Sequence, residues 1–177
     1  MKPSETVSVL PARAAVDALG KRGIDAEPVL TAAQLSREAL AQVDNRLPHE
    51  SVRRLWEAAA EADDDPSFGV HVAEALPTGA YDVFDYVIST AATVGEGLTL
   101  LTRYVRLIND RSNLHLVVEP HLARLSSCVS VPAPQYDEFS LTLLLVRSRQ
   151  ASGTDWTPEL MTFQHERHDS DRELARV

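Results

Sequence analysis

The N-terminal half of the chain places apolar side chains at the spacing of an α-helix. In residues 48–65, four of them stand at i, i+3, i+4 and i+7, which predicts a helix with one buried face. These four are Val52, Leu55, Trp56 and Ala59. Similar patterns predict further helices over residues 10–23, 31–40, 67–76 and 81–92.

Two of the predicted helices begin with the spacing of a capping box. In such a box the hydroxyl of the N-cap residue accepts a hydrogen bond from the backbone N–H three residues later. The side chain of that later residue accepts a hydrogen bond from the N-cap N–H. Thr31 and Gln34 have this spacing, and so do Thr93 and Glu96. The sequence therefore predicts helix starts at Thr31 and at Thr93, the second of them leading a helix over residues 93–110.

The helix over 93–110 has an apolar stripe with two arginines, Arg103 and Arg106, among its residues. Such a helix either reads DNA or packs a core. The stripe consists of Leu98, Leu101, Val105 and Ile108. The chain has a net charge of −9, and residues 61–65 read EADDD, whereas a duplex-binding surface is usually basic. The charge balance favours a core helix.

After residue 110 the pattern changes to short strands and one long helix. Residues 113–120 and 123–132 predict an antiparallel strand pair, and residues 158–166 predict a third strand. Between them, residues 135–153 predict a helix that should be central and buried, because one run in it is apolar on nearly all sides. The run consists of Leu141, Leu143, Leu144, Leu145 and Val146. Helices followed by β-α-β predict an α+β domain, with a helical N-terminal half packed on a small, mainly antiparallel sheet and a buried C-terminal helix.

Composition narrows the class of protein. The chain has 177 residues, of which 44% are hydrophobic, as expected for one globular domain or one domain with a tail. A single cysteine excludes an intrachain disulfide framework. There is no apolar run long enough for a membrane span and no signal-peptide core, so we expect a cytoplasmic protein.

Residues with catalytic or metal-binding chemistry form no recognisable motif. No Gly-x-Ser-x-Gly elbow occurs, and Cys128 stands in a strand pattern that predicts an inert, buried thiol. His165 and His168 are three apart, so on one strand they face opposite sides and share no metal ion. We expect no enzyme activity, no metal site and no cofactor.

Domains with helices over a small sheet often hold a small molecule in their interior. The predicted interior is mainly aliphatic, and four polar side chains in it are candidate ligand contacts: Tyr86, Tyr104, His115 and His165. Each of them is also explained as a polar group satisfied within the core or its rim. This interior suits an apolar or aromatic acid better than a free sugar.

The order of several segments resembles the N-terminal effector domain of AraC/XylS-type transcriptional regulators, in its arabinose-binding-domain-like subgroup. The strings that carry the resemblance are VSVLPARAAVDALGKRGIDAEPVL, RLPHESVRRLWEAAAEADDDPSFGVHVAEAL, YVISTAATVGEGLTLLTRYVRLIND and DWTPELMTFQHER. Each is a structural motif, and only the ordered set is specific.

The resemblance implies an effector-sensing domain over residues 1–168, lacking its final strands, followed by a tail over 169–177. It also implies a homodimer, and contact with DNA only through a C-terminal helix-turn-helix domain that is absent from this chain. The expected function is therefore small-molecule sensing for transcription control. The alternative is a standalone small enzyme or carrier that acts on an apolar or aromatic acid.

Overall fold

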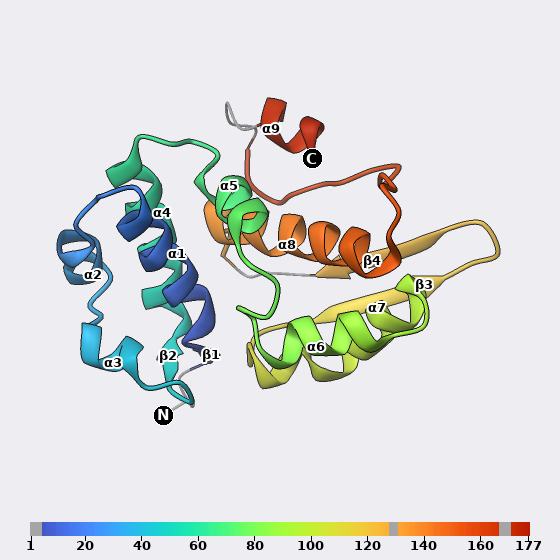
Figure 1. Cartoon of the computed structure of the whole chain (residues 1–177), viewed down its shortest axis with the longest axis horizontal. Coiled ribbons are helices and arrows are strands. Elements are labelled where there is room, and N and C mark those ends of the chain that lie inside the picture. The colour runs from blue at the N-terminus through green and yellow to red at the C-terminus, as the bar shows by residue number, and fades with distance from the viewer. Residues whose placement is uncertain (1–4, 128–130, 167–170) are drawn as a thin grey trace.

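A computed structural model describes residues 5–127, 131–166 and 171–177. The first part of the chain is a short strand followed by four helices, which Figure 1 shows grouped at one side of the molecule. Strand β1 (Thr6–Ser8) pairs antiparallel with β2 (Arg46–Pro48), so that Val7 lies opposite Leu47. The helices are α1 (Leu10–Lys21), α2 (Glu27–Ala32), α3 (Arg37–Ala41) and α4 (His49–Asp63).

The buried face predicted for α4 is confirmed. Its four stripe residues have no exposed surface, and the Trp56 ring is the centre of an aromatic cluster. The Trp56 ring centroid lies 5.8 Å from that of Phe68 and 4.4 Å from that of Phe139. These two partners belong to α5 (Phe68–Ala75) and α8 (Pro134–Ser152), so the core joins helices that are distant in the sequence.

Helix α8 is the central helix that the sequence predicts, and α5 packs directly against it. The Gln135 side chain fixes the contact, because its Oε1 accepts from the Gly69 N–H at 2.8 Å and its Nε2 donates to the Pro66 carbonyl at 2.9 Å. A Cβ on Gly69 would overlap the Gln135 carbonyl group. Glycine is therefore required at residue 69 by the close approach of the two helices.

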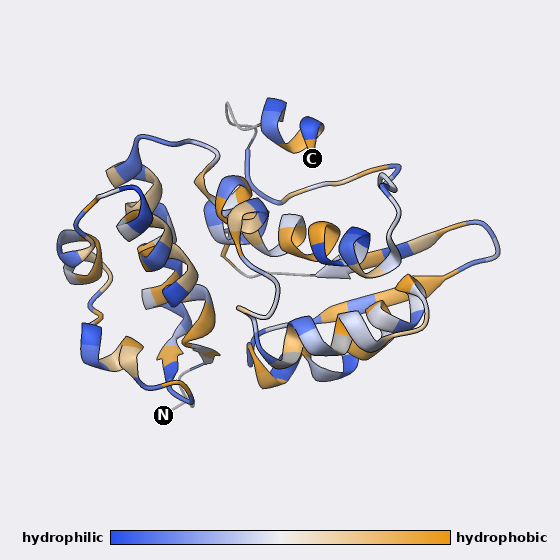
Figure 2. Ribbon diagram, viewed as in Figure 1, coloured by the Kyte–Doolittle hydropathy of each residue, from blue (hydrophilic) through white to orange (hydrophobic). Residues whose placement is uncertain are grey.

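The next two helices lie below α8 in the view of Figure 1. Helices α6 (Val83–Thr90) and α7 (Val94–Tyr104) form a helical hairpin, and a 3-10 turn, η1 (Val105–Leu107), follows. Strands β3 (Leu114–Val118) and β4 (Ala123–Ser127) then pair antiparallel, as predicted. Figure 2 shows this β-hairpin reaching out with a hydrophilic tip. A short helix, α9 (Asp171–Arg176), comes at the end of the chain.

The α+β class is confirmed, but the third predicted strand is wrong. Residues 158–166 lie outside any strand, with bends at residues 159, 164 and 165, although burial still alternates and Met161, Phe163 and His165 are half-buried. No described strand lies beside them to complete a ladder, so the segment forms no sheet. The β1–β2 pair was not predicted, and the described residues form two separate two-stranded sheets where one sheet was expected.

The capping predictions have mixed outcomes. The Thr93 hydroxyl accepts from the Glu96 N–H at 3.1 Å, as predicted, although the Glu96 carboxylate accepts from the Ala92 N–H instead of that of Thr93. The predicted helix start at Thr31 is wrong, because Thr31 lies inside α2. A left-handed residue, Gln34 with φ 57°, separates α2 from α3. Cys128 and His168 lie outside the described residues.

Candidate ligand-binding cavity

A cavity of about 230 Å³ lies between the α6–α7 hairpin and the N-terminal part of the chain. Phe84 and Ile88 of α6 and Leu101 of α7 contribute apolar side chains to its wall, and Leu10 of α1 contributes another. Ile88 and Leu101 are almost fully buried, as expected for the inward faces of an amphipathic helix pair. The cavity therefore has a mainly apolar wall, built by segments that are distant in the sequence.

A buried ion pair holds the segment that brings Tyr81 and Asp82 to this cavity. The Arg147 Nε donates to Asp85 Oδ1 at 2.7 Å, and both side chains are 3% exposed. The other Asp85 oxygen accepts from the backbone N–H groups of Gly79 at 2.7 Å and Tyr81 at 3.0 Å. These bonds attach the loop between α5 and α6 to the middle of the protein.

The rest of the Arg147 guanidinium completes this attachment. It donates to the carbonyl oxygens of Leu76 at 3.1 Å and Pro77 at 2.9 Å, and to Gln150 Oε1 at 2.9 Å. A buried charge is tolerated only where it is paired and hydrogen-bonded, and Arg147 meets both conditions. The loop that carries Tyr81 and Asp82 is thus fixed relative to α8.

Arg46 organises the opposite wall. Its Nε donates to the Thr6 hydroxyl at 2.8 Å, and its Nη1 donates to the Leu107 carbonyl at 2.7 Å. Its Nη2 contacts Asp110 Oδ1 at 2.7 Å. The Thr6 hydroxyl, with help from Arg46, holds the pKa of Asp110 below its usual value. Arg46 therefore ties β1 and β2 to the segment after η1.

Two carboxylates at the cavity differ from these paired groups. Asp44 and Asp82 both line the cavity and are exposed at its edge. Within the part of the chain that the structure describes, neither carboxylate has a hydrogen bond or an ion pair. Asp82 holds the N-cap position of α6 without capping it, and its backbone has φ 46°.

The structure does not bring the four predicted contact residues together. Tyr104 lines the cavity, and the Arg103 guanidinium lies 5.4 Å from the centre of its ring. Tyr86 is 69% exposed on α6, and His115 is exposed on β3 opposite Ser126. A ligand-binding role for these residues stays a prediction, and the geometry favours it most for Tyr104.

His165 lies near the start of α8 and away from the cavity. Its Nε2 is 3.5 Å from Oε1 of the buried Glu138, and its ring lies 5.0 Å from that of Phe163. The polar neighbour of the His165 ring is thus a carboxylate of α8. Burial raises the pKa of two neighbouring carboxyls, Glu57 and Asp137, which accept hydrogen bonds from the first turn of α8 and its cap.

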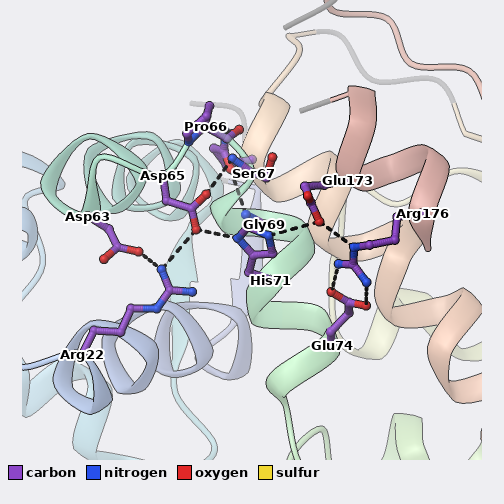
Figure 3. Close-up of polar contacts among 11 residues, drawn as sticks. Arg22, Asp63, Asp65, Pro66, Ser67, Gly69, His71, Glu74, Glu173 and Arg176 are labelled. Carbon is purple, nitrogen blue, oxygen red and sulfur yellow. Dashed lines mark hydrogen bonds and ion pairs between the residues drawn. The ribbon is translucent and has the colours of Figure 1, made fainter. Parts of the chain in front are cut away.

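A second polar cluster joins α9 to α5 (Figure 3). The His71 Nδ1 lies 2.7 Å from Asp65 Oδ2, and its Nε2 lies 3.5 Å from Glu173. The Arg176 guanidinium contacts Glu74 at 2.5 Å and Glu173 at 2.6 Å. The hydrogen bond from Arg176 is the main reason why the pKa of Glu173 is lowered. Helix α9 is thus held to α5 through charged groups.

Other kinds of site are not found in the described ranges. Among residues 5–127, 131–166 and 171–177, no group of three or more histidine, cysteine or acidic side chains is placed to hold a metal ion. No helix in those same ranges has the length and apolar character needed to cross a membrane.

Sequence reasoning overlooked Asp44, Asp82 and Arg46. Exposed aspartates resemble ordinary solvated residues in a sequence, and Asp82 also resembles a routine helix cap before α6. Their common location depends on contacts between distant segments. The one signal available in the sequence was the position of Asp82, a polar residue just before a helix with an apolar face.

A mixed helical domain with a mainly apolar cavity and a few polar groups at its edge is typical of small-molecule-binding domains. Comparison with known proteins gives the family. The family model described as the arabinose-binding domain of AraC transcription regulators, N-terminal, matches residues 23–177, and the chain belongs to this family. The resemblance inferred from the sequence is confirmed, and the chain is a regulatory ligand-binding domain of the AraC type.

A similar curated protein is the ornithine utilization regulator of Pseudomonas aeruginosa. It is 24% identical over 129 residues, which cover 73% of this chain and 38% of the relative. The chain therefore matches about two fifths of that regulator's length.

Proposed function

We propose that this domain senses a small, mainly apolar molecule in the cavity between the α6–α7 hairpin and the N-terminal strands, and so controls transcription through a separate DNA-binding domain. The observation that carries this proposal is the cavity itself, since its walls come from both sides of the fold. A ligand there contacts both sides at once, and it stabilises whichever arrangement binds it better.

The size of the cavity limits the ligand. An apolar cavity of roughly 150 Å³ accommodates benzene. The cavity here is about 230 Å³, which suits a single aromatic ring with a short substituent or a short alkyl chain. The sequence led us to expect an apolar or aromatic acid, and the wall supports the apolar part of that expectation. The relative is named for ornithine utilization, so ornithine also belongs among the molecules to test.

Thermal unfolding with neutral probes tests the cavity. Indole and toluene should raise the melting temperature, because a ligand that binds only the folded state adds about 2.7 kcal/mol of stability at a hundredfold excess over its Kd. The variant Val105→Trp places a large side chain at the cavity and should remove the shift. The control Leu160→Trp changes a residue that is 79% exposed and should keep it.

Three outcomes would contradict the proposal. They are a melting temperature that no probe raises, a rise in Val105→Trp equal to that of the parent, and chemical turnover of a probe by the domain. Turnover would favour the enzyme alternative. Light scattering of the same samples tests the homodimer that the resemblance implies. A gel shift should show no discrete complex of this acidic chain with duplex DNA.

A further inference from the structure

We infer that the ligand of this cavity carries an organic cation, an ammonium or guanidinium group attached to an apolar body. The inference rests on the proposed function and adds the charge of the ligand to it. It departs from the acid that the sequence led us to expect. Three features of the cavity support it: an arginine whose guanidinium is already hydrogen-bonded to protein groups, two carboxylates without protein partners, and aromatic rings in the wall.

The first feature is the state of Arg46. It is the one cation among the described residues that line the cavity. Its three guanidinium nitrogens already contact Thr6, Leu107 and Asp110. Asp110 already balances the charge of Arg46. An acidic ligand that drew the guanidinium away would break these bonds and weaken the contact between the β1–β2 pair and the segment after η1. Arg46 is therefore a structural group of the wall.

The second feature is the pair of carboxylates. Asp44 and Asp82 line the same cavity from different loops, and no hydrogen bond or ion pair to a described residue occupies either carboxylate. The next acidic residue in the chain, Asp85, shows the contrast, because Arg147 balances its charge. The cavity thus presents two negative charges without a protein partner, and these attract a cation and repel an acid.

The backbone of Asp82 points to a role other than capping. Its φ of 46° lies in the left-handed region, which is unfavourable for a residue other than glycine. An aspartate at a helix N-cap normally has an extended backbone and accepts a helical N–H, whereas the Asp82 carboxylate accepts none. The fold therefore holds a strained residue at the cavity edge and leaves its charged oxygens available.

The third feature is aromatic. Tyr81, Phe84 and Tyr104 all line the cavity. The face of an aromatic ring attracts cations, and rings combined with carboxylates are a common way of recognising ammonium groups. Tyr104 already demonstrates this, since the Arg103 guanidinium lies 5.4 Å from its ring centre. Apolar side chains further along the wall would hold the body of the ligand.

Matched pairs of probes that differ in charge test the inference. The probes are phenethylamine against 3-phenylpropanoate, and hexylamine against hexanoate, with affinity measured by calorimetry and by thermal shift. Both amines should bind more tightly than their matched acids. Asp82→Asn should weaken amine binding about tenfold, the effect of losing one charge-assisted hydrogen bond. Asparagine has nearly the same shape as aspartate, so this variant should keep the fold.

Asp44→Asn should weaken amine binding in the same direction. The matched control is Asp17→Asn, which removes one exposed carboxylate on α1 away from the cavity and should leave amine binding unchanged. Amine binding that weakens in both cavity variants and not in the control supports the inference.

The other outcomes overturn it in distinguishable ways. If the acids bind and the amines do not, the inference is wrong while the cavity remains the ligand site. If the amines bind equally to all three variants, their binding is independent of these carboxylates. If neither the charged probes nor indole and toluene bind, the proposed function fails as well.

Discussion

Replacing Gly69 with alanine tests the packing that underlies the whole fold. An added Cβ would lie 3.0 Å from the Gln135 carbonyl carbon and 3.1 Å from the Phe139 nitrogen, and it would overlap the Gln135 carbonyl oxygen. Non-bonded carbon atoms prefer about 3.5–4.0 Å, so α5 and α8 must separate by at least about 0.5–1 Å. All three atoms belong to the backbone, so no side-chain rotation relieves the overlap.

The expected loss of stability combines three effects. Overpacking a core costs about 1–3 kcal/mol. Separation also weakens the 2.8 Å bond from the Gly69 N–H to Gln135 Oε1, and a buried polar group without its partner costs about 1–3 kcal/mol. Alanine returns about 1 kcal/mol of helix propensity. Gly69→Ala should therefore destabilise the domain by about 1–5 kcal/mol.

Urea unfolding of Gly69→Ala beside Gly95→Ala provides the assay. Gly95 lies in α7, and a Cβ there meets nothing within 4 Å. Gly95→Ala should therefore gain up to about 1 kcal/mol from propensity alone. If Gly69→Ala were as stable as the parent, the close contact of α5 with α8 would be refuted, and with it the placement of the aromatic cluster.

Three further changes test other parts of the structure. Arg147→Met should cost about 3–5 kcal/mol in urea unfolding, because it leaves the Asp85 carboxylate buried without its cation. The double variant with Asp85→Asn should recover part of this loss. If the losses of the two single variants simply added in the double variant, the pairing would be contradicted. Glu57→Gln tests a pH dependence, because burial raises the folded-state pKa of Glu57 and the parent therefore loses stability as the pH rises through that value. The glutamine does not titrate and keeps an oxygen for the Gln135 N–H. The stability of the variant relative to the parent should therefore be greater in neutral than in mildly acidic buffer. An identical pH dependence in parent and variant would exclude this titration. Trp56→Ala should cost about 3–5 kcal/mol, and an unchanged melting curve would contradict its burial.

The helices could be predicted because their signals are local. The stripe in α4 and the Thr93 cap of α7 depend on residues within two turns of each other, and both occur in the structure. Strand pairing is different, because β1 and β2 are about forty residues apart and each has three residues. Residues 158–166 have the alternation of a strand, but alternation cannot supply a neighbouring strand.

The candidate site was harder to predict than the fold. Tyr104 was predicted as one of four polar contacts in a mainly aliphatic interior, and it does line the cavity. Asp44 and Asp82 were missed because what distinguishes them is the lack of a protein partner, which only the folded chain reveals. The sequence likewise gave no sign that Arg46 is occupied by Thr6, Leu107 and Asp110.

The position of α8 has a consequence for synthesis of the protein. Phe139 covers Trp56 and lies 83 positions after it in the chain. At about 5–20 residues per second, a ribosome needs about 4–17 s to make that stretch. Throughout this interval the Trp56 ring has been translated but Phe139, which covers one part of it, has not. The aromatic core around Trp56 therefore cannot close until α8 has been made, so the first half of the chain is expected to complete its packing only late in synthesis.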